Sequence, residues 1–342
     1  MKTAAAILVE QHKPLLVDEV ELPQLGYGQV LVEVKSTRLC GSQLGEIDGV
    51  KGPDRYLPHL LGHEAGGVVL EIGPEVSHVR PGDRVVLHWR PGAGIQAATA
   101  KYRLGSRTIN AGNITTFQGL TVVSENRLTR IPDTVDFETA ALLADTITTG
   151  FGAVTRDARV EIGESVVVIG VGGIGLGVVL GAHLAGAHPI IAVDVHDHKL
   201  AKARSFGATH TVNARQESLE EAVHDRLGGL ADAVFDVTGQ PAVLDAAWRV
   251  MNRRSRLVLV GVMPHDKQVS LNTLAMHYGK SIIGSEGGSS LPHIDIPRYL
   301  RMLSAGRFDA ADMVSHRYPL HDVNAAIDAM RAGESVHIML DC

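Results

Sequence analysis

The most informative stretch of the chain reads Ser165-Val-Val-Val-Ile-Gly170-Val-Gly172-Gly173-Ile-Gly175. Its short run of β-branched residues is typical of a strand buried on both faces of a sheet. The glycines that follow match G-x-G-x-x-G, in which the first allows a tight turn, the second a close approach of a pyrophosphate, and the third close packing of helix and strand. This pattern predicts a strand, a turn and a helix that bind a dinucleotide.

The residues around the motif favour this interpretation over a chance turn in a glycine-rich chain. Apolar residues recur at helical spacing over 176–184, so we expect a helix that begins at Ile174 and offers unpaired N–H groups to the phosphates. A second strand, 190–193, leads to Asp194, an acid about 20 residues after the motif, where a ribose contact is expected. The predicted cofactor contacts are Gly170, Gly172, Gly173, Ile174, Gly175 and Asp194.

Length and composition limit the remaining possibilities. A chain of 342 residues, 45% of them hydrophobic, fits two domains with substantial cores. The net charge of −6 and the lack of a basic stripe argue against a nucleic-acid partner. There is no signal-peptide layout and no uninterrupted apolar run of about 18 residues, so we expect a cytoplasmic protein without a membrane segment. Two cysteines do not form a disulfide framework.

The two parts of the chain have different patterns. Residues 1–146 contain many short apolar runs, such as 30–34, 67–72 and 83–87, separated by Pro and Gly, which predicts β-rich structure. From 147 onward, strand and helix patterns alternate, which is typical of a doubly wound parallel sheet. We therefore expect an α/β protein with a β-rich N-terminal part.

Two spots in the β-rich part carry chemically active side chains. They are Cys40-Gly41-Ser42-Gln43 and Gly62-His63-Glu64-Ala65-Gly66-Gly67. Cysteine and histidine are common zinc ligands. Their separation here is no metal signature, however, and a buried Cys and a hydrogen-bonded His explain the residues as well.

Taken together, these motifs resemble the zinc-dependent alcohol and polyol dehydrogenases of the medium-chain dehydrogenase/reductase superfamily. The resemblance extends along most of the chain, through Pro81-Gly82-Asp83-Arg84-Val85, Thr148-Thr149-Gly150-Phe151-Gly152-Ala153 and the helix pattern over 318–334. It implies a GroES-like catalytic domain formed by 1–146 and 287–342, and a Rossmann NAD-binding domain formed by 147–286. It also implies an active site in the cleft between these domains.

The resemblance further implies a catalytic zinc on Cys40, His63 and Asp145, with Glu64 as an alternative or transient ligand. Asp145 stands where many members carry Cys, and its other interpretation is a helix cap before Thr146. Ser42 matches the hydroxyl that passes the alcohol proton to solvent, and is otherwise a turn serine.

Three departures from the family pattern are visible. Gln43 replaces an Asp that orients the zinc-bound His, and Gly45 replaces a relay His. Residues 92–105 lack the four Cys of a structural zinc site. We therefore expect one zinc per chain, and packing rather than metal to order that segment.

Further contacts are implied in the same way. Lys199 matches a basic residue beside the adenosine ribose, and Thr238, Val260 and Val262 match positions near adenosine and nicotinamide. Their other interpretations are an exposed helix face and plain strand-ending turns. Trp89, between His88 and Arg90, matches a residue that lines the substrate pocket, and is otherwise a packing residue at a strand end.

The resulting expectation is a zinc- and NAD-dependent alcohol dehydrogenase, acting as a homodimer or homotetramer. Its substrate is expected to be a polar secondary alcohol, such as a polyol, an aminocyclitol or a sugar derivative. Two alternatives are a zinc-free enone or quinone reductase of the same superfamily and a non-catalytic dinucleotide-binding protein. Neither needs Cys40, His63, Asp145 and Ser42 together.

Overall fold

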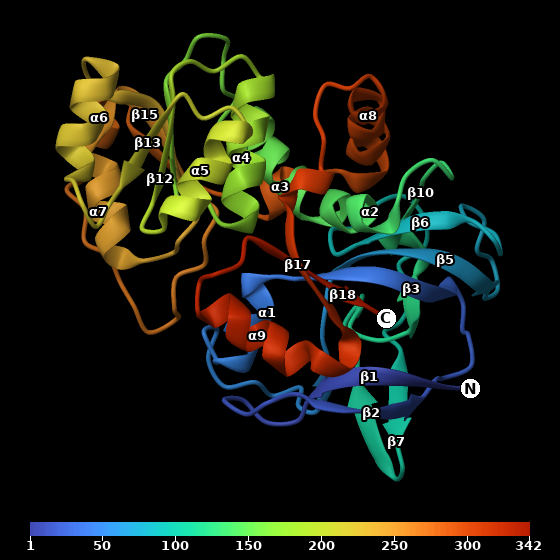
Figure 1. The fold of residues 1–342 in the computed structure, drawn as a ribbon. Coiled ribbons are helices and arrows are strands. Elements are labelled where there is room, and N and C mark those ends of the chain that lie inside the picture. Colours follow the sequence, from blue (N-terminus) through green and yellow to red (C-terminus); the bar gives the residue numbers. More distant parts are fainter. The chain divides into compact units, whose positions relative to one another are not determined.

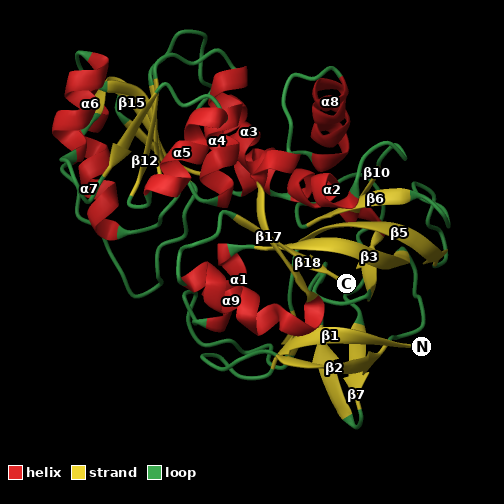
Figure 2. Cartoon of the chain, in the orientation of Figure 1, coloured by secondary structure: helices red, strands yellow, loops and turns green.

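The computed structural model describes residues 1–342, which form two compact units. Unit 1 comprises Met1–Asp145 and Leu291–Cys342, and unit 2 comprises Thr146–Ser290. Figure 1 follows the chain through both, and Figure 2 shows that strands dominate unit 1 while strands and helices alternate in unit 2.

Unit 2 is built on a six-stranded parallel sheet. Its strands are β11 (Val166–Ile169), β12 (Ile190–Asp194), β13 (His210–Asn213), β14 (Ala231–Asp236), β15 (Met251–Leu259) and β16 (Ser281–Gly284). Their spatial order is β13-β12-β11-β14-β15-β16. Numbered along the unit this is 3-2-1-4-5-6, the order of a dinucleotide-binding doubly wound sheet. The predicted Rossmann fold is confirmed.

Helices and helical turns lie before, between and after these parallel strands. They are α3 (Thr146–Gly152), the π-helical turn η2 (Ala153–Asp157), α4 (Gly173–Leu184), α5 (Asp197–Ser205), α6 (Leu219–Leu227), α7 (Pro241–Arg249) and the 3-10 turns η3 (Thr273–Tyr278) and η4 (Gly287–Ser289). Strand residues such as Val167, Ile191 and Val234 form one core with Leu244 and Trp248 of α7. The apolar run of β11 is therefore explained by burial on both faces.

Unit 1 contains a closed barrel and a seven-stranded sheet. The barrel order is β1-β2-β7-β8-β4, and the sheet order is β10-β6-β5-β3-β18-β17 with β9 paired to β3. The barrel strands are β1 (Lys2–Leu8), β2 (Leu16–Glu21), β4 (His59–Leu60), β7 (Lys101–Leu104) and β8 (Arg107–Asn110). The sheet strands are β3 (Gln29–Leu39), β5 (Glu64–Ile72), β6 (Arg84–His88), β9 (Leu120–Ser124), β10 (Leu128–Arg130), β17 (Val314–Pro319) and β18 (His337–Asp341).

Few helices accompany these strands. They are α1 (Gly41–Ile47), α2 (Phe137–Ala144), α8 (Pro292–Ser304), α9 (Val323–Arg331) and the 3-10 turns η1 (Glu125–Arg127), η5 (Ala311–Met313) and η6 (Leu320–Asp322). The strands expected at 30–34, 67–72 and 83–87 are parts of β3, β5 and β6. The GroES-like domain expected from the resemblance agrees with this architecture.

The pairing of β3 with β5 brings the two chemically active spots together. These strands are antiparallel, with Thr37 opposite Ala65, so Cys40 at the end of β3 lies near His63 at the start of β5. Gly66 explains how Asp145 comes close to these two spots. A Cβ on Gly66 would lie 2.5 Å from the Phe137 carbonyl oxygen and 2.8 Å from the Ala140 Cβ, so only glycine lets α2 pack directly on β5. Asp145 follows α2 and is thereby placed beside the same strand.

Hydrogen bonds hold residues 95–97, which belong to the 92–105 segment that was expected to be ordered by packing rather than metal. The Glu125 carboxylate accepts from the N–H of Ile95 over 2.8 Å, and Ser124 Oγ accepts from the N–H of Ala97 over 2.7 Å. Arg127 donates to Gln96 Oε1 over 2.7 Å. Side chains from one short 3-10 turn and the strand before it therefore hold the segment that precedes β7.

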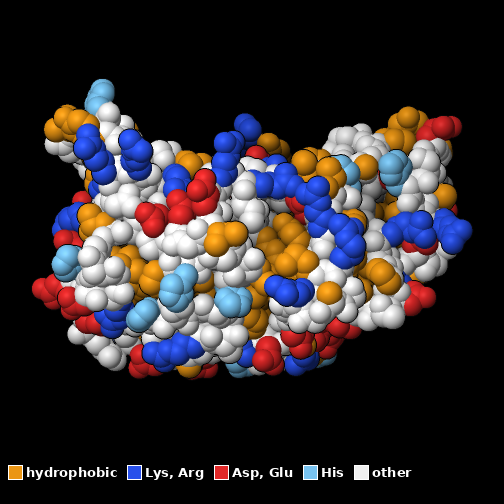
Figure 3. All heavy atoms as spheres, turned by 90° about the horizontal axis from the view of Figure 1, so that it is seen from above, with side chains coloured by type: hydrophobic (Ala, Val, Ile, Leu, Met, Phe, Trp, Pro, Cys, Tyr) orange, Lys and Arg blue, Asp and Glu red, His pale blue; other side chains and the backbone are white.

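The surface carries both charges. Basic and acidic side chains are spread across the face that Figure 3 shows, in keeping with 32 basic and 38 acidic residues in the chain. None of the helices combines the length and the hydrophobicity needed to cross a bilayer.

Candidate active site

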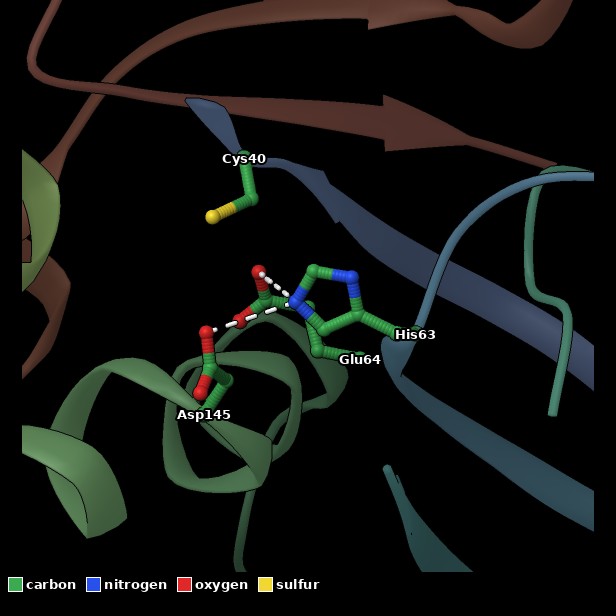
Figure 4. A group of neighbouring side chains, drawn as sticks. All are labelled: Cys40, His63, Glu64 and Asp145. Carbon is green, nitrogen blue, oxygen red and sulfur yellow. Dashed lines mark hydrogen bonds and ion pairs between the residues drawn. The ribbon is translucent and has the colours of Figure 1, made fainter. Parts of the chain in front are cut away.

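Four metal-binding side chains converge in unit 1. They belong to Cys40, His63, Glu64 and Asp145, and one ligand atom from each lies within 4.8 Å of all the others. Figure 4 shows Cys40 and Asp145 on either side of the His63 ring and the Glu64 carboxylate. Cys40 is 8% exposed and Glu64 is fully buried. The residues predicted as metal ligands are thus brought together by three separate elements.

The donor atoms fit a tetrahedral zinc ion. Nitrogen and oxygen ligands about 2.1 Å from a tetrahedral zinc lie about 3.4 Å from each other. His63 Nε2 and Asp145 Oδ2 are 3.3 Å apart. Thiolate, imidazole and carboxylate are the donors that zinc prefers. Cys40, His63 and Asp145 can therefore hold zinc with little rearrangement.

Arg38 binds the carboxylate of Glu64, the remaining residue of the cluster. This arginine, 2% exposed, lies in β3 and donates from Nε to Glu64 Oε1 over 2.7 Å. One other buried atom of each side chain, Glu64 Oε2 and Arg38 Nη2, has no hydrogen-bond partner. Buried polar atoms normally have a hydrogen-bond partner, so the hydrogen bonds within the cluster leave some of its polar atoms unsatisfied. A cation among the carboxylates would supply the missing interaction of Glu64 Oε2, whereas Arg38 Nη2 is a donor and lies 3.7 Å from Asp145 Oδ2.

The pKa values of the cluster reflect crowded charge in a buried place. Burial is the largest effect on Glu64 and raises its pKa to about 8, against the opposing charge of Arg38. Burial would also raise the pKa of Cys40, but Arg38 and His63 lower it to about 6. Burial would lower the pKa of His63, yet Asp145, Cys40 and Glu64 raise it well above its usual value. Without a cation the cluster therefore holds protons on Glu64 and His63, which a bound dication would release.

Gln43 contacts the other side of the His63 ring. Its amide nitrogen lies 2.5 Å from His63 Nδ1, and its Oε1 accepts from the N–H of Cys40 over 3.0 Å. Gln43 therefore occupies the place of the orienting carboxylate that the family pattern has at this position. The donor and the acceptor of the Gln43–His63 contact depend on which ring nitrogens carry a proton.

Trp89 and His88 lie at the end of β6, and their side chains have different surroundings. The Trp89 indole Nε1–H donates to Asp145 Oδ1 over 2.9 Å, so Trp89 contacts a ligand residue directly. His88 is fully buried, and its ring nitrogens contact the Arg90 carbonyl and Thr129 Oγ1. His88 therefore lies in the core and gives no polar side chain to a substrate pocket.

Ser42 is not part of the four-residue cluster. It lies exposed in the first turn of α1, two residues after Cys40. Gly45, in the same helix, provides no side chain that could carry a proton further.

The glycine-rich turn of unit 2 has the predicted geometry. Gly170 has a φ of 88°, which glycine adopts without strain. A Cβ on Gly175 would lie 2.0 Å from the Gly170 carbonyl oxygen, so helix and strand approach as closely as expected. A Cβ on Gly172 would meet nothing within 4 Å, and α4 begins there without a side-chain cap. Open space at an uncapped helix N-terminus suits a phosphate.

The other predicted cofactor contacts surround this turn. Asp194 Oδ2 accepts from the N–H of Val171 over 3.0 Å, which ties the end of β12 to the motif. Thr238 packs against Gly170, and the turn after β14 lies against Val262, which is 61% exposed. Val260 begins that same turn, and Lys199 lies half-buried in α5. All except Lys199 lie at the carboxyl ends of parallel strands, where such sheets bind ligands.

Arg38 was not identified from the sequence, although a signal was present. It stands two positions before Cys40, in a strand in which half of the other residues are apolar. An arginine buried in a strand needs an anionic partner. The sequence does not show which of its 38 acidic residues that partner is.

Comparison with known proteins supports the same picture. The model of the "Alcohol dehydrogenase GroES-like domain" matches residues 26–133, and that of the "Zinc-binding dehydrogenase" matches residues 173–305. The S-(hydroxymethyl)glutathione dehydrogenase of Paracoccus denitrificans is 32% identical over 98% of both chains.

Solved structures agree. An alcohol dehydrogenase zinc-binding domain protein from Burkholderia ambifaria superposes with a TM-score of 0.91, at 28% identity, over 100% of this chain and 99% of the other. The 2R,3R-butanediol dehydrogenase of Bacillus subtilis gives 0.82 at 26% identity, over 99% of each chain. These relatives support a dehydrogenase rather than either alternative considered from the sequence. The chain belongs to the zinc-dependent alcohol dehydrogenases of the medium-chain dehydrogenase/reductase superfamily and is a zinc- and NAD-dependent alcohol dehydrogenase.

Proposed function

We propose that this dehydrogenase interconverts a polar secondary alcohol and its carbonyl compound with one catalytic zinc held by Cys40, His63 and Asp145. The observation that carries the proposal is the convergence of these three side chains in unit 1. When bound, zinc lowers the pKa of a hydroxyl or polarises a carbonyl, and NAD accepts or returns a hydride. Three protein ligands leave one position for substrate.

The chain's own residues supply binding and orientation. Cys40, His63 and Asp145 hold the metal, and Arg38 holds Glu64 by a hydrogen bond of 2.7 Å, so Glu64 is not a permanent ligand. Ser42, exposed at the start of α1, takes the alcohol proton towards solvent. Since Gly45 offers no further group, water or a cofactor hydroxyl completes this path.

Unit 2 binds the cofactor in this proposal. Gly170, Gly172, Gly173, Ile174 and Gly175 surround the pyrophosphate, and Asp194 accepts from the ribose hydroxyls. Thr238, Val260 and Val262 lie along the nucleotide, and Lys199 beside the adenosine ribose. The open space at Gly172 and the uncapped start of α4 support this assignment.

The substrate class rests on different grounds. Two similar proteins are named for hydroxylated, polar substrates, an S-(hydroxymethyl)glutathione and a butanediol. Arg90, whose guanidinium carbon is 5.6 Å from the centre of the Trp89 ring, remains as a polar neighbour of the site. We therefore propose a polyol, an aminocyclitol or a sugar derivative as the substrate.

The test is a substrate panel on protein of measured zinc content. Rates with NAD are compared for matched pairs, such as 2,3-butanediol and 2-butanol, and for inositols, aminocyclitols and sugar alcohols. We expect one zinc per chain and a higher kcat/KM for hydroxylated substrates. If simple aliphatic alcohols are faster than every polyol, the substrate class is wrong. If no alcohol or carbonyl compound reacts, the whole proposal is wrong.

A further inference from the structure

Trp89 is fixed in place beside Asp145. It follows β6, and its ring packs against the apolar cluster that includes Val69 and Val85. Arg127 donates to the Trp89 backbone carbonyl, and Arg90 lies against the ring. With the ring and backbone held, the indole N–H points at Asp145 Oδ1 over 2.9 Å.

The two oxygens of Asp145 have different surroundings. Oδ1 is turned to the indole. Oδ2 lies 3.3 Å from His63 Nε2 and 3.7 Å from Arg38 Nη2, within the ligand cluster. Figure 4 shows this oxygen directed at the His63 ring. The carboxylate is therefore oriented to offer Oδ2 to a metal.

This orientation matters for a catalytic zinc. A carboxylate that binds through both oxygens takes two coordination positions, and with Cys40 and His63 it would fill a four-coordinate ion. A catalytic zinc needs an open position for substrate. A thiolate at residue 145 would raise no such problem, because it has a single donor atom.

The indole is well suited to the task. It is a hydrogen-bond donor only and carries no charge. It can thus occupy Oδ1 without neutralising Asp145, whereas an ammonium or guanidinium there would weaken the carboxylate as a ligand. Groups that hydrogen-bond to metal ligands commonly affect metal affinity 10- to 100-fold.

We propose that Trp89 is a positioning residue that makes Asp145 a one-oxygen ligand and so keeps the fourth zinc position open. This inference rests on the proposed function, specifically on Asp145 as a ligand. It assigns to Trp89 a role through Asp145 that is separate from any contact with substrate.

Metal binding by Trp89→Phe tests the inference. The variant keeps an aromatic ring and loses the N–H. Zinc-stripped protein is titrated with Zn²⁺ against a chelator, and then loaded with Co²⁺ for visible spectra. We expect the dissociation constant for Zn²⁺ to rise by about tenfold or more. The Co²⁺ spectrum should also change, because the second Asp145 oxygen takes the position that an exchangeable ligand holds in the wild type.

Three further variants make the result specific. Trp248→Phe changes the only other tryptophan of the chain, in unit 2, and should leave zinc affinity within about twofold. In an Asp145→Cys background, Trp89→Phe should have no added effect. If Asp145→Asn loses zinc while Trp89→Phe matches the wild type, the inference is overturned and the ligand set stands. If Asp145→Asn keeps zinc, the ligand set fails and the inference falls with it.

A measurement on full-length protein without the Trp89 substitution covers the case in which Trp89→Phe does not fold. With two tryptophans in the chain, ¹⁵N-labelled indoles give two N–H signals, and Trp248→Phe identifies that of Trp89. In Asp145→Cys this proton should move upfield and exchange faster with water. An unchanged Trp89 signal in Asp145→Cys would overturn the inference.

Discussion

Asp194 illustrates how one residue serves both the fold and cofactor choice. Its Oδ1 accepts from the N–H of Val195 over 2.8 Å and of His196 over 3.0 Å, and its Oδ2 accepts from Val171. A carboxylate can accept about four hydrogen bonds, so capacity for a ribose hydroxyl remains. The negative charge would repel the 2′-phosphate of NADP.

We therefore predict that NAD is preferred over NADP by at least about tenfold in kcat/KM, or about 1.4 kcal/mol. Asp194→Asn should reduce this ratio, because the charge is lost. Asp197→Asn, at the start of the following helix, is the control and should leave the ratio unchanged. Equal use of both cofactors by the wild type would refute the assignment of Asp194.

Gln43 gives a second prediction at this scale. A zinc-bound His63 that coordinates through Nε2 carries its proton on Nδ1, which then needs an acceptor. Gln43 now turns its amide nitrogen to that atom at 2.5 Å. In Gln43→Glu a carboxylate oxygen would accept from Nδ1, so we expect zinc affinity to rise by about tenfold. Chelator competition measures it, and unchanged or weaker binding would speak against Nε2 coordination.

Among the elements, η1 shows how a short 3-10 turn orders its neighbours. The carboxylate of Glu125 accepts from the N–H groups of Ser77, His78 and Ile95 over 2.6, 2.7 and 2.8 Å. Burial acts to raise the pKa of Glu125, but these hydrogen bonds lower it below its usual value. A lowered folded-state pKa gives stability that is present above about pH 4.3 and is lost as the pH falls through the folded value.

In Glu125→Gln an amide NH₂ must face a backbone donor, so we expect a loss of about 1–3 kcal/mol in the free energy of unfolding at pH 7. The difference from the wild type should shrink as the pH falls through the lowered folded-state pKa of Glu125, where the wild-type carboxylate itself becomes protonated. Urea unfolding at several pH values measures both effects. Glu138→Gln, which breaks a surface pair with Arg317, is the control and should cost under about 1 kcal/mol. A pH-independent difference would contradict this role of Glu125.

The elements were more predictable than the contacts between them. Short-range signals were sufficient for β11, the glycine turn and α4, because each depends on residues close in the sequence. The barrel of unit 1 was not predictable, since its order joins β8 to β4, two strands that lie far apart along the chain. A short apolar run predicts a strand without naming its partner.

The site shows the same limit. Cys40, His63 and Asp145 were predicted through family resemblance, and the structure brings them together. The hydrogen bonds from Arg38 to Glu64 and from Trp89 to Asp145 join residues 26 and 56 positions apart. Such pairs depend on side-chain direction in the packed fold. His88 shows the same limit, because its ring is buried in the core although the residue stands next to Trp89 in the sequence.

For the whole molecule, the residues proposed to bind the metal and those proposed to bind the cofactor lie in different units. The metal cluster belongs entirely to unit 1, and the glycine turn with Asp194 belongs to unit 2. We predict that removal of zinc by a chelator abolishes turnover but changes the dissociation constant for NAD by less than about threefold, an energy near 0.7 kcal/mol. Calorimetric titration of stripped and reloaded protein with NAD measures this. One equivalent of zinc should restore activity, and a parallel loss of NAD binding would contradict the separation.

The central claim is that Asp145 is the third zinc ligand, and Asp145→Asn tests it most directly. The substitution removes one negative charge at nearly constant size, and Asn caps helices about as well as Asp. Elemental analysis and turnover of the wild type and this variant are measured together, with NAD binding as the check on folding. We predict one zinc per chain in the wild type, and a joint loss of zinc and activity in the variant while NAD still binds. Two zincs per wild-type chain, or a variant with normal zinc and activity, would contradict it.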